Sequence, residues 1–389
     1  MDEAQIRQAV AWLIDGARSA QEAHEVLDVL CRRLVAAGLP LWRVAVFVRT
    51  LHPNVMGRRF GWRADTGVTV DNARYTVFES PTFKGSPVDL VYRTAAPVRR
   101  RLLDPACPID HTIIKELRDD GATDYLAQPL AFSDGQLHCV TWATDAVGGF
   151  SDAHVAAFDS IVPALARVAE IRALRRTAIN LLDTYVGRRS GARILAGHVQ
   201  RGDVETIEAA FWYSDLREFT HLNETLPPAD LLALLNDYFE AVATAADANG
   251  GEVLQFIGDA ALVIFPVGTA GRGTACRNAL VAARAALDAV ATVNQRRAAA
   301  GQAIIRFGIG LHVGAVSWGN VGGVDRLGLN VIGPAVNRTA RIESLTKEVG
   351  RPLLVSQDFA DALDETCEPV GRFVLKGVQE PQAVYAVQL

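Results

Sequence analysis

The stretch "VLQFIGDAALVIF", residues 253–265, decides the fold of the second half of this chain. It contains two short apolar segments joined by Gly258-Asp259, a pattern that predicts two strands in a hairpin. A glycine at the first position of a two-residue loop suits a type II′ turn, which holds the following residue rigidly. The stretch therefore predicts a carboxylate, Asp259, at the tip of a hairpin. The amide of Gln255 lies just before it on an otherwise apolar strand.

Strand and helix patterns alternate around this hairpin. Residues 205–216 read as a strand rich in aromatic residues, and helices are expected over 227–251, 277–301 and 333–350. Residues 305–322, "IRFGIGLHVGAVSWGNVG", are expected to hold two strands about a glycine-rich bend, and 351–356, 371–377 and 382–389 to be closing strands. The pattern predicts helices packed against one sheet.

The first half of the chain has a different order of elements. A helix is expected over residues 5–37, a strand over 43–51, a hairpin over 124–145 with its turn at 133–135, and a long helix from about residue 151. This order resembles that of a GAF-type sensory domain. Residues 181–203 are rich in glycine and arginine and interrupt the helical pattern, as either an inert linker or a joint that transmits motion would.

Length and composition limit the possible classes of protein. A chain of 389 residues predicts two domains, and a formal net charge of -5 gives no sign of nucleic-acid binding. The five cysteines form no CxxC pair, which argues against a disulfide framework and fits a reducing cytoplasm. No uncharged apolar run reaches 18 residues, so no membrane span is expected.

Two carboxylates are candidates for metal binding. Asp215 comes just after the apolar strand pattern "AAFWYS", and Asp259 is at the hairpin tip. If the two strands are neighbours, both carboxylates lie on one rim and form a hard oxygen site, suited to Mg²⁺ or Mn²⁺ with a phosphate substrate. Aspartate is also common in turns for local reasons, so the pair alone does not establish this site.

Asn337 and Arg341 are four residues apart in the helix expected after Gly333-Pro334, so they share a face. Arginine offers a fixed fork for phosphate, and asparagine offers an amide that orients a ribose or an oxyanion. A solvated polar helix face gives the same pattern.

Four blocks in this order carry a family resemblance: "FWYSDLREFT", "VLQFIGDAALVIF", "VIGPAVNRTARIESL" and "VLKGV". Together they resemble the catalytic domain of class III adenylate and guanylate cyclases, over residues 205–389. The resemblance implies an α+β fold, with a ferredoxin-like βαββαβ cyclase domain at 205–389. A smaller GAF-like α/β regulatory domain at 1–172 and a helical linker or transducer at 173–204 would precede it.

The resemblance also implies roles for individual residues. Asp215 and Asp259 match the two metal-binding aspartates, and Leu216 matches the residue whose backbone carbonyl binds one of two Mg²⁺ or Mn²⁺ ions. Asn337 and Arg341 match the pair that acts in the transition state, and Lys376 matches a lysine that holds the terminal phosphates. Family members form head-to-tail dimers in which each active site takes its aspartates from one protomer and its Asn/Arg pair from the other.

The chain departs from the family pattern at the base-reading positions. Adenylate cyclases of this family usually carry a lysine three residues before the hairpin glycine, and an aspartate or threonine seven residues before the asparagine. Here these positions are Gln255 and Asn330. An amide donates and accepts hydrogen bonds, so the pair fits adenine, guanine or a pyrimidine.

The prediction from the sequence is a cytoplasmic homodimeric adenylate cyclase, a phosphorus–oxygen lyase that makes cyclic AMP and pyrophosphate from ATP. The alternatives are a cyclase for GTP or a pyrimidine triphosphate, and a non-catalytic signalling module that binds nucleotide. No haem, flavin or metal signature identifies a ligand for the N-terminal domain.

Overall fold

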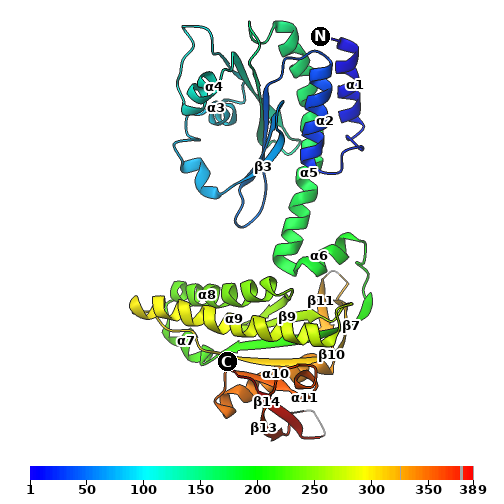
Figure 1. The fold of residues 1–389 in the computed structure, drawn as a ribbon, viewed down its shortest axis with the longest axis vertical. Coiled ribbons are helices and arrows are strands. Elements are labelled where there is room, and N and C mark those ends of the chain that lie inside the picture. The colour runs from blue at the N-terminus through cyan, green and yellow to red at the C-terminus, as the bar shows by residue number, and fades with distance from the viewer. Residues whose placement is uncertain (325, 377–379, 389) are drawn as a thin grey trace. The chain divides into compact units, whose positions relative to one another are not determined.

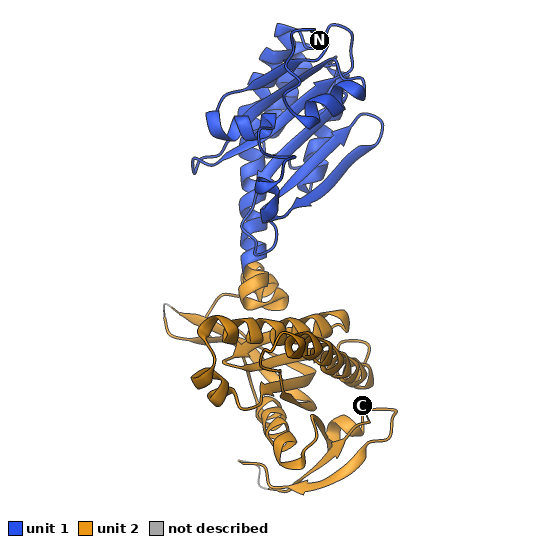
Figure 2. Ribbon diagram, turned by 90° about the vertical axis from the view of Figure 1, so that its left-hand side faces the viewer, with its two compact units in different colours: residues 1–181 blue, residues 182–389 orange. Residues whose placement is uncertain are grey.

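The computed structural model describes residues 1–324, 326–376 and 380–388. The chain forms two compact units, Met1–Leu181 and Leu182–Leu389 (Figure 2). The boundary between them falls inside one long helix, α5 (Asp152–Val186).

The first unit is built on a sheet in the order β3-β2-β1-β6-β5-β4, in which every neighbouring pair is antiparallel. Its strands are β1 (Arg43–Arg49), β2 (Gly57–Arg63), β3 (Gly67–Ala73), β4 (Val98–Arg101), β5 (Asp124–Ala131) and β6 (Leu137–Thr144). The β5–β6 pair is the hairpin predicted over residues 124–145.

Helices cover both faces of this sheet (Figure 1). The first core holds α1 (Glu3–Ile14), α2 (Ala23–Ala36) and α5, and the second holds α3 (Pro87–Thr94) and α4 (Thr112–Asp119). The single helix predicted over 5–37 is wrong, because Gly16 (φ 82°) and Ala17 (φ 51°) adopt left-handed backbone conformations that end the first helix. The GAF-like assignment stays a prediction.

The second unit is built on a mixed sheet in the order β13-β14-β12-β10-β7-β9-β8, with β11 paired to β10. Only the β10–β12 pair is parallel among the described strands. The strands are β7 (Val204–Leu216), β8 (Glu252–Ile257), β9 (Ala260–Pro266), β10 (Phe307–Gly322), β11 (Leu327–Ile332), β12 (Leu353–Ser356), β13 (Glu368–Phe373) and β14 (Gln382–Ala386).

Long helices pack on the two faces of this sheet. α8 (Pro228–Ala248) and α9 (Arg272–Ala299) share a core with Trp212, and α10 (Pro334–Val349) shares a core with Phe211. Because adjacent strand residues point to opposite faces, α10 covers the face opposite to α8 and α9 (Figure 1). The remaining helices are α6 (Arg188–Leu195), α7 (Phe219–Thr225) and α11 (Gln357–Ala360). The order from β7 to β10 is βαββαβ, and the predicted α+β class is confirmed.

The prediction of two strands about a bend at residues 305–322 is wrong, because β10 is one strand of 16 residues. Its glycines serve packing and not bending. A Cβ on Gly310 would stand 2.5 Å from the carbonyl oxygen of Thr339, and one on Gly308 would stand 2.6 Å from Oε1 of Glu343. Both contacts lie on α10, so the missing side chains let that helix lie directly against the strand.

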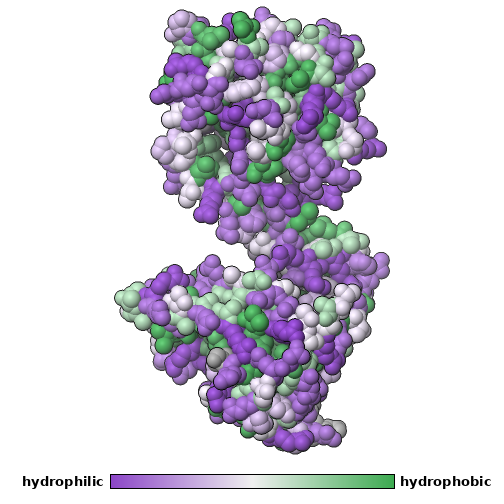
Figure 3. Space-filling view, viewed as in Figure 1, coloured by the Kyte–Doolittle hydropathy of each residue, from purple (hydrophilic) through white to green (hydrophobic). Residues whose placement is uncertain are grey.

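None of the described helices is long and apolar enough to cross a membrane. On the face seen in Figure 3, hydrophobic residues lie in small groups among hydrophilic ones.

We expect Gly310→Ala to lower the free energy of unfolding by about 1–3 kcal/mol, because the new methyl group meets helix backbone that cannot rotate away. Urea unfolding followed by circular dichroism measures this. Gly323→Ala is the matched control, since a Cβ there meets nothing within 4 Å. Equal stability of the two variants would contradict the packing argument.

Candidate active site

The ends of β7 and of the β8–β9 hairpin bring Asp215 and Asp259 together. Asp215 pairs in register with Ala260, the residue directly after Asp259. Gly258 has a φ of 64° and Asp259 does not have a positive φ, as the predicted type II′ turn requires. Two carboxylates that are 44 residues apart in sequence therefore share one rim of the sheet.

The two acids interact strongly. The pKa of Asp215 is raised from 3.8 to about 7, first by burial and then by the neighbouring Asp259, through a hydrogen bond that needs a shared proton and through charge repulsion. With both groups ionised, Oδ1 of Asp215 is buried and has no hydrogen-bond partner among the described residues. A bound cation would relieve both the desolvation of this half-buried, unpartnered carboxylate and its repulsion with Asp259.

The donor set fits a divalent cation of the Mg²⁺ or Mn²⁺ type. Both side chains offer oxygen, and Leu216 adds a backbone carbonyl directly after Asp215. In the described part of the chain, no group of three or more His, Cys, Asp or Glu residues could hold a metal. A cation here would therefore take its remaining ligands from backbone, water and substrate phosphate, as Mg²⁺ commonly does.

A third acid lies beneath this rim and was missed in the sequence. Glu343 on α10 is only 4% exposed, and it is among the charges that raise the pKa of Asp215. Burial raises the pKa of Glu343 itself, while Arg217, with Nη1 3.6 Å from Oε1 of Glu343, lowers it. Arg217, two residues after Asp215, also donates a hydrogen bond to Thr346 of α10. This contact ties the chain just after β7 to that helix. The only signal in the sequence was an arginine two residues after Asp215.

Asn337 and Arg341 lie on one exposed face of α10, as predicted. The buried face of the same helix includes Ala335, Thr339 and Ile342. Among the described residues, no hydrogen bond or ion pair joins Asn337 or Arg341 to either aspartate. Lys376 is exposed after β13 and directly precedes residues 377–379, which lie outside the described part of the chain.

The predicted base-reading residues lie far apart within one chain. Gln255 is exposed on the edge strand β8, and Asn330 is half-buried on β11, with β9, β7 and β10 between them. Asn330 pairs with Gly319, and Gly319 pairs with Val204 at the start of β7, whereas Asp215 is near the end of β7. Gln255 pairs with Leu262 and Leu262 pairs with Tyr213, so nine residues of β7 separate its position from that of Asn330, which is about 30 Å along the strand.

The first residues of the second unit contact the base of the hairpin. The backbone N–H of Arg189, on α6, donates to Oε1 of Glu252 at 2.8 Å, and Glu252 is the first residue of β8. Gly187 precedes α6 with a φ of 87°, and a Cβ there would stand 2.8 Å from the same oxygen. The end of α5 is therefore followed at once by a contact to the strand that leads to Asp259.

The rim of acids, the exposed Asn/Arg face and the βαββαβ order lie together in one part of the chain. Residues 203–388 match the adenylate and guanylate cyclase catalytic domain. This match supports the class III resemblance for the second half of the chain and does not extend to residues 1–202.

Cyclases are also among the similar proteins. The adenylate cyclase of Anabaena cylindrica is 34% identical over 164 residues, which cover 41% of this chain and 32% of that protein. Adenylate cyclase 1 of Rhizobium meliloti is 27% identical over 305 residues, which cover 72% of this chain and 44% of that protein. This chain thus spans less than half the length of either curated relative.

A solved cyclase structure is similar as well. The crystal structure of the guanylyl cyclase Cya2 is 31% identical, with a TM-score of 0.42, over 48% of this chain and 93% of that chain.

We expect Asp215→Asn to stabilise the metal-free protein at pH 8. The folded-state pKa of Asp215 is raised, so the free-energy cost of ionising this group in the folded protein is absent below its ordinary pKa of 3.8, grows as the pH rises and is complete above about 7. After allowance for partial exposure, the gain is about 1–2 kcal/mol. Urea unfolding in EDTA at pH 8 and pH 4.5 measures it.

Two further measurements sharpen this test. The exposed Asp288→Asn is the matched control and should change little. Adding Mn²⁺ should stabilise the wild type and not Asp215→Asn. A variant that is less stable than the wild type at pH 8 without metal would refute the electrostatic account.

Proposed function

We propose that this protein is a nucleotidyl cyclase that converts ATP to 3′,5′-cyclic AMP and pyrophosphate. The observation that carries the proposal is the half-buried carboxylate pair, Asp215 with Asp259, in a segment that matches the cyclase catalytic domain. The unpartnered Oδ1 of Asp215 supports a role in cation binding.

Asp215, Asp259 and the carbonyl of Leu216 would hold two Mg²⁺ or Mn²⁺ ions. When bound, such ions lower the pKa of the ribose 3′-hydroxyl and offset charge on the triphosphate. The chain's own residues then act on the substrate. Asn337 orients the ribose, Arg341 stabilises the charge that develops on the α-phosphorus, and Lys376 holds the terminal phosphates.

The active form would be a homodimer, because one chain cannot assemble these groups. Gln255, Asp215 and Asp259 lie toward one end of β7 and Asn330 is at the other, about 30–36 Å away along the strand. Two copies in head-to-tail arrangement would each give one group to each of two identical sites. Exposed apolar side chains near the carboxylates support a contact there: Phe256 is 46% and Ile257 is 44% exposed on β8.

The base would be read by Gln255 from one protomer and Asn330 from the other. Gln255 donates to N1 of adenine and Asn330 accepts from its amino group at C6. Because an amide can turn over, the same pair also fits guanine, and this favours GTP as the second candidate substrate.

The first unit would act as a GAF-like regulatory domain. Support comes from α5, which starts in that unit and ends at Val186, with only Gly187 between it and α6. The contact between Arg189 and Glu252 then offers a route to the hairpin that carries Gln255 and Asp259.

We expect cyclic AMP from ATP in the presence of Mn²⁺, with slower or no turnover of GTP, CTP and UTP. Chromatography of the products from each triphosphate measures this. Asp259→Asn should lower turnover at least a hundredfold, since it removes a metal ligand, whereas Asp288→Asn should not. If none of the four triphosphates yields a cyclic product, the chain is the non-catalytic alternative.

We expect two inactive variants to restore activity when they are co-expressed. Asp259→Ala disables the aspartates of its protomer, and Arg341→Ala disables the Asn/Arg pair of its protomer. A mixed dimer therefore has one intact site and one site that lacks both groups. Random pairing gives about a quarter of wild-type turnover. Recovery no greater than the sum of the separate variants would refute a shared active site.

A further inference from the structure

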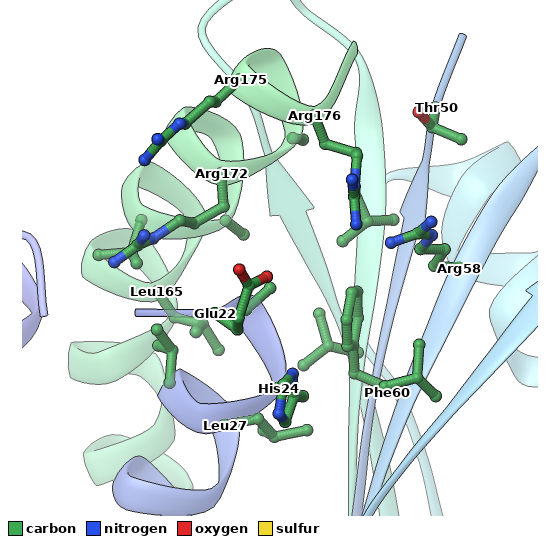
Figure 4. A pocket seen from close by; sticks show the side chains of 18 of the residues that line it. Glu22, His24, Leu27, Thr50, Arg58, Phe60, Leu165, Arg172, Arg175 and Arg176 are labelled. Carbon is green, nitrogen blue, oxygen red and sulfur yellow. The ribbon is translucent and has the colours of Figure 1, made fainter. Parts of the chain in front are cut away.

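The first unit contains a cavity of about 510 Å³ that no residue role above uses. It lies between the start of α2, the sheet face formed by β1–β3, and the last turns of α5 (Figure 4). Its volume is within the range of small-molecule sites in proteins. Its walls are partly apolar, with Val46 and Phe60 from the sheet, Leu27 from α2, and Leu165 and Val168 from α5.

The polar part of the lining is strongly cationic. It includes Arg58 from β2 and Arg172, Arg175 and Arg176 from α5, against one carboxylate, Glu22. Arg172 already donates to the backbone carbonyls of Ala20 (2.7 Å) and Gln21 (2.6 Å). Within the described residues, no carboxylate forms an ion pair with Arg58 or Arg176.

These two free arginines face each other from opposite walls. Figure 4 shows the side chains of Arg58 and Arg176 turned toward one another across the cavity. Burial lowers the pKa of Arg58, and the charge of Arg176 lowers it further. Thr50, on the same side as Arg58, has a buried hydroxyl with no hydrogen-bond partner among the described residues. Two guanidinium groups that face each other without an ion-pair partner among the described residues leave hydrogen-bonding capacity for an oxyanion.

We propose that this cavity binds an organic anion, with a carboxylate or phosphate head between Arg58 and Arg176 and an apolar body against Phe60, Leu165 and Val168. The head gains charge-assisted hydrogen bonds from two guanidinium forks. The body buries apolar surface on the sheet and on α5. Both parts of the ligand are needed, because the lining combines the two arginines with the apolar side chains of Phe60, Leu165 and Val168.

Binding would join the sheet to the helix that leaves the unit. Arg58 lies on β2, whereas Arg176 lies ten residues before the end of α5 at Val186. A bound head would fix the last turns of α5 against the sheet. Control of turnover by this ligand rests on the proposed cyclase function, but the binding itself does not.

Calorimetry on the full chain tests the site with four probes. Decanoate and decyl phosphate carry head and body, decanol carries only the body, and inorganic phosphate only the head. We expect saturable binding of one molecule per chain for decanoate or decyl phosphate, at least tenfold tighter than for decanol or phosphate. Preference between the two anions identifies the head group.

The double variant Arg58→Met/Arg176→Met should weaken binding of the preferred anion at least tenfold, because methionine keeps the apolar stem and removes the charge. Arg7→Met/Arg118→Met, on exposed positions outside the cavity, is the matched control. Arg176 is exposed, so Arg176→Met alone gives a folded test if the double variant is unstable. Failure of both anions to bind, equal binding of decanol, or undiminished binding by the variants would overturn the proposal.

Two readouts separate this proposal from the cyclase proposal. Hydrogen exchange should slow in residues 169–179 when the anion binds, whether or not the chain makes a cyclic nucleotide. If anion binding changes turnover in the wild type but not in Arg176→Met, the site also regulates the enzyme. Binding without any cyclic product would leave the site in place and refute only the cyclase.

Discussion

The close approach of α10 to β10 is the constraint on which the second unit depends. Gly308 and Gly310 remove the side chains that would keep the helix away from the strand. Glu343 can then sit below the end of β7, where Arg217 balances its charge, while Asn337 and Arg341 remain on the outer face. One packing contact thus sets the charge around Asp215 and the direction in which the Asn/Arg pair is presented.

The sheet holds the two carboxylates and Asn330 at opposite ends along its strands. The carboxylates are fixed by the end of β7 and by a tight turn, both of which are rigid. Asn330 is fixed by β11 at the other end of the same sheet. In the proposed homodimer each chain would supply part of two sites, and any agent that alters how two chains meet would alter both sites at once. A shift of α6 would reach β8 through the hydrogen bond from Arg189 to Glu252, so this contact could regulate how two chains meet.

Local patterns predicted the elements that local chemistry determines. Gly258-Asp259 specified its turn because a positive φ is almost reserved for glycine, and the apolar strand before Asp215 specified where that strand ends. The glycines of β10 were misread as a bend, because glycine marks both turns and close packing. Glu343 was missed because only the tertiary structure buries it. The cavity arginines were missed because Arg58 and Arg176 meet only when the sheet and α5 pack together.

Both halves of the chain hold two side chains of like charge close together, and among the described residues neither pair is joined to an opposite charge by an ion pair. Asp215 and Asp259 repel each other at the rim of the sheet, and Arg58 and Arg176 do so in the cavity. Each arrangement costs folding free energy when it is empty, and a ligand of opposite charge returns that energy on binding. The cavity is lined by α5, and just after α5 the backbone N–H of Arg189 on α6 donates a hydrogen bond to Glu252, the first residue of the strand before Asp259, so occupancy of the cavity has a physical route toward the hairpin. A ligand that only filled apolar space would not relieve the repulsion between Arg58 and Arg176. The anionic head of the ligand, more than its apolar body, therefore determines how firmly α5 is held against the sheet.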